Sequence, residues 1–203
     1  MIGSLLAPRS PFADLPFGAA RCILADPPWH FLNWSGRGEG KNPSAHYDCM
    51  SIEAIKALPV MDLADSGGCA LLMWATAPML PHAIETLGAW GFAFKSAGAW
   101  AKQSSTGRAW SFGTGYCFRS AVEFFLLGTI GEPVPKSRSV RNLIVAPVRQ
   151  HSRKPDQMRR MCEDLFDGPY VELFARERFD NWMAWGNQVG ILDDHENKET
   201  SLG

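Results

Sequence analysis

The chain has 203 residues, of which 46% are hydrophobic, and it carries a formal net charge of −1. This length suits one well-buried α/β domain and is too short for two full ones. The balanced charge excludes a uniformly basic nucleic-acid-binding protein. Because no apolar run approaches the roughly 18 residues of a membrane span, and the N-terminus lacks the features of a signal peptide, we expect no membrane association.

The cysteines are expected to be reduced thiols. Their number is odd, no two have CxxC spacing, and Cys22 and Cys69 lie in apolar runs typical of buried strands. This pattern favours a cytosolic protein over one with disulfides or zinc ligands, so we predict no metal site. The five are Cys22, Cys49, Cys69, Cys117 and Cys162.

The most informative segment follows the first predicted strand. Residues 1–20 are rich in Pro, Ala and Gly and are expected to be a loose lead-in, and residues 21–25 form an apolar strand. Asp26-Pro27-Pro28-Trp29 therefore falls at the carboxyl end of a strand, where ligand sites of open α/β sheets lie. An ordinary turn is the alternative, since Asp-Pro commonly begins one.

The chemistry of this tetrapeptide suits a flat heterocycle with an exocyclic amino group. Asp26 can accept a hydrogen bond, and the two prolines fix the backbone without contributing an N–H. Trp29 offers a stacking face.

Apolar runs then alternate with helical patterns. A long glycine-rich loop runs from His30 to Met50, and a second loop covers residues 101–118. Strands are predicted over 69–74, 92–100, 121–127, 142–147 and 170–175, and helices over 51–58, 78–90 and from Pro155 to 167. Such alternation predicts a mostly parallel sheet with helices on both faces. No helix separates 92–100 from 121–127, which predicts an antiparallel pair. The polar residues 190–203 are expected to be a flexible tail.

Basic residues cluster in one segment. Between Lys136 and Arg160 there are eight Lys and Arg against a single Asp. Such clustering is typical of a surface that binds a phosphate backbone, although an ordinary solvated surface explains it equally well.

Four pieces of sequence, in order, resemble one family: the adenine-N6 methyltransferases related to the catalytic subunit of the eukaryotic messenger-RNA N6-adenosine methyltransferase, which has bacterial and phage members. The pieces are Asp26-Pro27-Pro28-Trp29; His46-Tyr47; Ser152-Arg153-Lys154-Pro155-Asp156-Gln157; and Glu172-Leu173-Phe174-Ala175-Arg176 with Asn181-Trp182 and Gly186-Asn187-Gln188. The resemblance implies a methyltransferase domain over 21–189, between the lead-in (1–20) and the tail (190–203).

The resemblance also implies the fold and the cofactor. The fold would be a Rossmann-like S-adenosylmethionine-dependent methyltransferase fold, with a mostly parallel sheet, an antiparallel edge and a permuted order in which the target-base motif precedes the cofactor motif. S-adenosylmethionine would bind without a metal and leave as S-adenosylhomocysteine. Lys154 would pair with its methionyl carboxylate. The implied cofactor residues are Asp26, Lys154, Glu172, Arg176, Asn187 and Gln188.

The chain departs from the eukaryotic pattern in two places. The segment 177–180 is shorter, which puts ribose contacts there in doubt, and the loop from His30 to His46 is longer and glycine-rich. Substrate entry is therefore expected to differ.

The implied reaction is methylation of the N6 amino group of adenine in DNA, which we favour over RNA because the chain is compact and carries no added RNA-binding module. The implied catalytic residues are Asp26, Pro27, Pro28 and Trp29, and the implied substrate contacts are Trp29, Tyr47, Arg108, Arg149 and Arg153. A non-catalytic scaffold subunit that binds nucleic acid, and a small-molecule methyltransferase, are the other hypotheses. The expected location is the cytoplasm of a bacterium or a phage-infected cell. A homodimer or heterodimer stays open.

Overall fold

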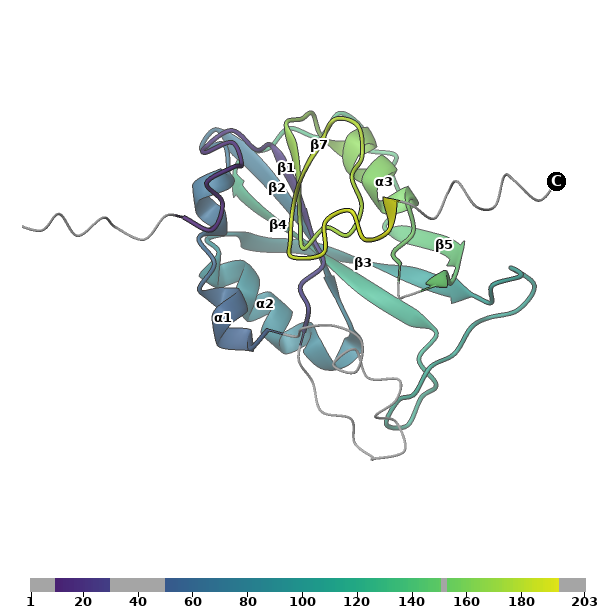
Figure 1. The fold of residues 1–203 in the computed structure, drawn as a ribbon. Helices are drawn as coiled ribbons and strands as arrows, with labels where there is room; N and C mark the ends of the chain where they lie inside the picture. Colours follow the sequence, from purple (N-terminus) through teal and green to yellow (C-terminus); the bar gives the residue numbers. More distant parts are fainter. Residues whose placement is uncertain (1–9, 30–49, 151–152, 194–203) are drawn as a thin grey trace, which may run out of the picture.

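The computed structural model describes residues 10–29, 50–150 and 153–193. In this part the chain forms a seven-stranded sheet of order β5-β3-β4-β2-β1-β6-β7, covered by short helices (Figure 1). The predicted α/β class with a mostly parallel sheet is confirmed. The elements are β1 (Cys22–Ala25), α1 (Ile52–Lys56), η3 (Val60–Leu63), β2 (Gly68–Ala75), η4 (Ala77–Met79), α2 (Leu80–Ala89), β3 (Ala93–Gln103), β4 (Val122–Gly131), β5 (Leu143–Pro147), α3 (Gln157–Leu165), β6 (Tyr170–Leu173) and β7 (Trp182–Trp185).

The direction of the strands decides where the loops meet. β1 pairs in parallel with β2 and β6, β6 with β7, and β3 with β5. β4 alone among these strands runs antiparallel to its neighbours β2 and β3, so the predicted antiparallel pairing is present. β4 is the third strand in the sheet order, so the antiparallel strand lies inside the sheet and is not one of its two outermost strands. β3 therefore runs parallel to β1, and their carboxyl ends lie at the same edge.

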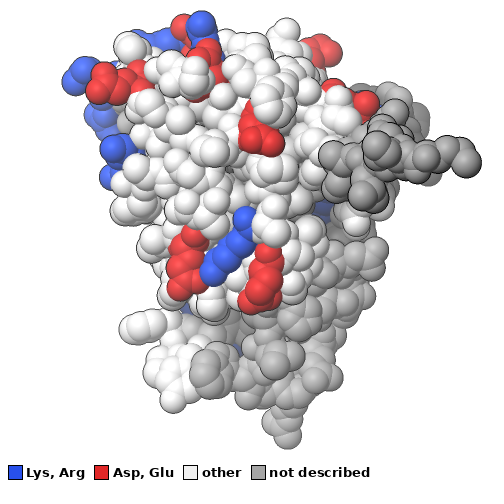
Figure 2. Space-filling view, turned by 90° about the vertical axis from the view of Figure 1, so that its left-hand side faces the viewer, with Lys and Arg blue, Asp and Glu red and all other residues white. Residues whose placement is uncertain are grey.

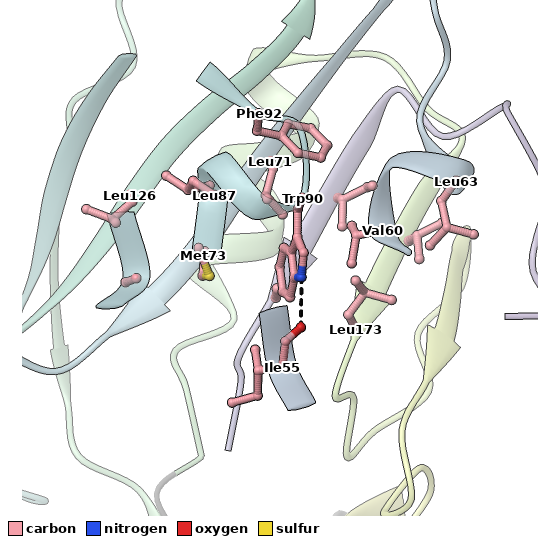
Figure 3. Close-up of a cluster of buried hydrophobic side chains, with 14 of the residues drawn as sticks. Ile55, Val60, Leu63, Leu71, Met73, Leu87, Trp90, Phe92, Leu126 and Leu173 are labelled. Atoms are coloured by element: carbon pink, nitrogen blue, oxygen red, sulfur yellow. Dashed lines mark hydrogen bonds between the residues drawn. The ribbon is translucent and has the colours of Figure 1, made fainter. Parts of the chain in front are cut away.

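Helices cover both faces of the sheet, as predicted. The α1 and α2 face buries a cluster that includes Leu71, Met73 and Leu126 from the strands (Figure 3). Within it the indole N–H of Trp90 donates to the Ile55 carbonyl over 2.9 Å, which ties the end of α2 to α1. The opposite face is covered by α3, whose buried side chains are Met158, Met161 and Cys162.

One expectation about the start of the domain is wrong. Residues 10–20 are not a loose lead-in, because Phe12 is buried and contacts the Trp185 ring edge to face at 4.9 Å. The Trp185 indole N–H also donates to the Pro11 carbonyl over 2.8 Å. At the other end of the domain no strand was predicted after 170–175, but the four-residue β7 follows β6 and pairs with it in parallel.

The remaining sequence expectations concern thiols, metals and membranes. Cys22, Cys69 and Cys162 are buried free thiols, whereas Cys117 is exposed. Over the described ranges, no group of three or more His, Cys, Asp or Glu side chains is placed to hold a metal ion. No helix in those same ranges has the length and apolarity that a membrane span needs.

Candidate active site at the carboxyl edge of the sheet

Asp26 occupies the predicted place directly after β1. β1 lies inside the sheet between β2 and β6. The Asp26 backbone N–H donates to the Leu173 carbonyl at the end of β6 over 3.3 Å. The half-buried Asp26 side chain therefore lies between the ends of two parallel strands, at the edge where α/β folds bind ligands.

Lys154 reaches this aspartate from a point 128 residues further along the chain. Its Nζ lies 2.9 Å from Asp26 Oδ2 and 3.0 Å from Glu123 Oε1, and 5.6 Å from the centre of the Trp74 ring. Burial alone would lower the pKa of this ammonium group, but the two carboxylates outweigh burial and raise the pKa above its ordinary value. Lys154 therefore stays protonated and is a fixed positive charge.

Glu123 is a site residue that the sequence analysis missed. It is 8% exposed on β4, and its second oxygen lies 2.7 Å from Lys102 Nζ on β3. Burial raises the pKa of this carboxyl, yet Lys154 and Lys102 together lower it to about 2. The one signal in the sequence was a single acidic residue inside the apolar run 121–127.

The turn that presents Lys154 is held by Arg149. The guanidinium of Arg149 donates to both oxygens of Asp156, at 2.8 and 2.9 Å, and to the Lys154 carbonyl. Burial raises the pKa of Asp156, but its bonds with Arg149 outweigh burial and lower it. Arg149 was predicted to contact substrate. The structure places it in the Lys154 turn, ahead of α3, and its contact with substrate stays a prediction.

A pocket opens beside Asp26 and Lys154, and most of the predicted cofactor residues line it. Its lining includes Asp26, Lys154, Glu172 and Arg176. Glu172 accepts two hydrogen bonds from Arg159, over 2.7 and 2.9 Å, and burial raises the pKa of its carboxyl despite this partner. Arg159, which also stacks on the Phe179 ring at 3.6 Å, is a second residue that the sequence analysis missed.

The basic segment 136–160 is largely neutralised by folding. Five of its eight basic side chains form ion pairs with carboxylates: Lys136, Arg149, Arg153, Lys154 and Arg159. Arg153, predicted to bind substrate, lines the pocket and donates to Glu177 over 3.0 Å. The phosphate-binding interpretation of this segment is therefore weaker than its sequence suggested. Figure 2 shows a different side of the molecule, the one that carries α1, where Lys and Arg lie among Asp and Glu on a largely uncharged surface.

The segment after β6 has an unusual backbone. Phe174 lines the pocket with φ of 61°, a left-handed conformation that non-glycine residues seldom adopt. Asn187 and Gln188 follow β7 but do not line this pocket. Gly186 lets their segment approach closely, because a Cβ there would lie 3.0 Å from the backbone of Ala175.

Trp29 is not where a stacking residue was expected. It is 6% exposed within the α1 and α2 core, and its indole N–H donates to the Trp74 carbonyl over 3.1 Å. A base could stack on Trp29 only if the indole were uncovered. The carbonyls of Pro27 and Pro28 already accept the backbone N–H groups of Trp29 and Met50, although each carbonyl keeps a second lone pair.

Some predicted residues lie elsewhere. Arg108 is exposed on the loop between β3 and β4. Tyr47, its neighbour His46, Ser152, the loop 30–49 and the tail 194–203 lie outside the described residues.

Comparison with known proteins gives a consistent result. Residues 20–188 match the MT-A70 family. A putative N(6)-adenosine-methyltransferase MT-A70-like protein of Medicago truncatula is 32% identical over 171 residues, which cover 82% of this chain and 26% of that protein. The N(6)-adenosine-methyltransferase catalytic subunit METTL3 of Homo sapiens is 29% identical over 177 residues, 85% of this chain and 28% of that protein.

A third relative matches along most of its own length. The type II methyltransferase M.MunI of Mycoplasma sp is 29% identical over 200 residues, which cover 88% of this chain and 81% of that protein. The chain thus spans about a quarter of the adenosine methyltransferases named above.

Proposed function

Because this chain belongs to the MT-A70 family, a family of S-adenosylmethionine-dependent methyltransferases, we propose that it transfers a methyl group from S-adenosylmethionine to the N6 amino group of adenine in DNA. One observation carries the proposal. Asp26 and Lys154, which the family resemblance implies at one site, lie 2.9 Å apart, although 128 residues separate them in sequence. The pocket beside them also contains Glu172 and Arg176.

The residues of the pocket fit this cofactor. Lys154 offers a permanent positive charge for the methionyl carboxylate, and Glu172 and Arg176 offer an acceptor and donors for the ribose. The family resemblance also implies adenosine contacts from Asn187 and Gln188, which lie outside the lining of this pocket. When bound, S-adenosylmethionine supplies an electrophilic methyl group.

The residues of this chain would orient the target nitrogen for the reaction. The adenine amino group is a poor nucleophile, because its lone pair is delocalised into the ring. Asp26 and the Pro27 carbonyl would accept its two hydrogens, which favours a tetrahedral nitrogen with its lone pair directed at the methyl group. The methylated nitrogen then loses its extra proton, which the Asp26 carboxylate or a water molecule beside it would accept. Lys154 and Glu123 keep the Asp26 carboxylate in place throughout.

DNA is our preferred substrate because the match to the type II methyltransferase extends over 81% of that protein. The matches to the adenosine methyltransferases cover 26 to 28% of those chains, so long regions of those relatives lie outside this similarity. To enter the site, the target adenine must leave a DNA duplex, which costs a few kcal/mol. This cost is smallest when the adenine is already in a single strand.

The experiment is transfer of labelled methyl from S-adenosylmethionine to double-stranded DNA, single-stranded DNA and RNA in parallel, with nucleoside analysis of the product. Asp26→Ala is expected to lower transfer by about 100-fold or more. The variant should fold, because Lys154 keeps Glu123 as its partner. Asp14→Ala, at an exposed position ahead of β1, is the matched control and should retain activity.

The possible outcomes separate the hypotheses. N6-methyladenine in DNA that disappears with Asp26→Ala supports the proposal. Label in RNA alone would keep the chemistry and replace the substrate. Substantial transfer by a folded Asp26→Ala protein would refute the site. Cofactor binding without transfer to any substrate would favour a scaffold subunit.

A further inference from the structure

The loop that joins β3 to β4 exposes an unusual set of side chains. This loop, residues 104–121, is called the aromatic arm below. Four of its aromatic side chains are largely in solvent: Trp110 (62% exposed), Phe112 (72%), Tyr116 (82%) and Phe118 (88%). Clustered exposed apolar side chains mark interaction surfaces in soluble proteins. The arm also carries Arg108 and Arg119 and no acidic residue.

The arm has a defined backbone. Beyond the ends of the two strands, the Ser111 N–H donates to the Lys102 carbonyl over 2.8 Å, and the Gly113 N–H to the Ser120 carbonyl over 2.7 Å. At its tip, a Cβ on Gly115 would overlap the carbonyl oxygen of Phe118, so the turn depends on glycine. The tip thus holds its aromatic side chains in solvent on a constrained backbone.

The arm starts at the candidate active site. β3 and β1 run in the same direction, so the arm leaves the sheet at the edge where Asp26 lies, and it projects beyond the end of β3 (Figure 1). Its two stems carry Lys102 and Glu123, which are joined at 2.7 Å. Glu123 contacts Lys154, and Lys154 contacts Asp26. Three ion pairs in sequence therefore connect the base of the arm to the catalytic aspartate.

We infer that the aromatic arm binds unpaired nucleotides of the strand that carries the target adenine. Exposed aromatic rings give stacking faces for bases of any identity, and arginine contributes charge to phosphates and stacking of its own. The absence of carboxylates from the arm removes the repulsion that a nucleic-acid backbone would meet. Between the rings the chain carries only small residues, namely Ser111, Gly113, Thr114, Gly115 and Cys117, so the arm presents separate stacking faces.

This inference rests on the proposed nucleic-acid substrate, so its test measures binding and not transfer. The probe is a fluorescently labelled oligothymidine of about 15 nucleotides, read by anisotropy on the full chain at fixed salt. Because the probe contains no adenine, the target-base site contributes nothing. Each of Trp110→Ala and Phe118→Ala should weaken binding by about fivefold to a hundredfold. Trp110→Phe and Phe118→Tyr should bind as the unmodified protein does.

The control is Phe17→Ala, which removes an aromatic side chain of similar exposure (75%) far from this edge. It should leave binding unchanged. Unchanged binding in both arm alanine variants would overturn the inference. So would sedimentation showing that these variants convert a dimer to a monomer while oligothymidine binding stays the same, since the arm would then dock a second copy of the chain. The protein could also transfer no methyl group to any substrate, yet bind oligothymidine in a way that Trp110→Ala weakens. That result would refute the proposed reaction and support the assignment of the aromatic arm.

Discussion

Replacing Glu123 with glutamine tests whether a buried carboxylate organises the candidate site. The change keeps the shape of the side chain and removes its charge. In the folded chain the pKa of Glu123 falls from the ordinary 4.5 to about 2, because Lys154 and Lys102 outweigh the effect of burial. That difference corresponds to about 3 kcal/mol of folding free energy at neutral pH. Glu123→Gln should therefore lower the free energy of unfolding at pH 7 by about 2 to 3 kcal/mol.

The pH dependence gives a second readout. A carboxyl whose folded pKa is depressed stabilises the protein fully above its unfolded pKa, and this contribution is lost as the pH falls through the folded pKa. The window here runs from about 4.5 down to about 2. The difference between the two proteins should be about 1.4 kcal/mol smaller at pH 3.5 than at pH 7.

Urea denaturation at pH 7 and pH 3.5 measures both quantities. Glu132→Gln, at an exposed glutamate, is the matched control and should change stability by less than about 0.5 kcal/mol. The reasoning fails if Glu123→Gln costs no more than this control at pH 7, or if its cost is the same at both pH values.

Three other substitutions test the pocket and the core. Arg159→Lys loses the two-point contact with Glu172 and should weaken S-adenosylmethionine binding about tenfold in calorimetry, with a normal melting curve; unchanged affinity would argue against Glu172 as a cofactor residue. Trp90→Phe removes a buried hydrogen bond to α1 and should cost about 1 to 2 kcal/mol in urea denaturation; no loss would mean that the bond contributes nothing net. Gly98→Ala should cost about 2 kcal/mol or more, because its Cβ would overlap the Phe125 ring; a variant as stable as the original would show that β3 shifts freely.

Local sequence patterns predicted the elements well. Short apolar runs such as 22–25 and 69–74 became strands, because a buried parallel strand needs apolar residues on both faces. Ser51 begins α1, and its side chain accepts the N–H of Ala54 over 3.1 Å. The apolar run 22–25 also predicted correctly that Asp26 follows the carboxyl end of a strand. β7 was not predicted, and its place in the sheet depends on pairing with β6.

The sequence by itself determined the kind of fold, the order of its motifs and the resemblance that brought Asp26 and Lys154 into one hypothesis. Only the tertiary structure decided what these side chains face. The insertion of β4 between β3 and β2 delivers Glu123 to Lys154, and the packed core takes up Trp29. Folding also pairs half of the eight basic side chains of segment 136–160 with carboxylates outside that segment. The physical reason is that strand propensity and motif identity are properties of neighbours along the chain, whereas charge pairing and burial depend on which strands become neighbours in the sheet.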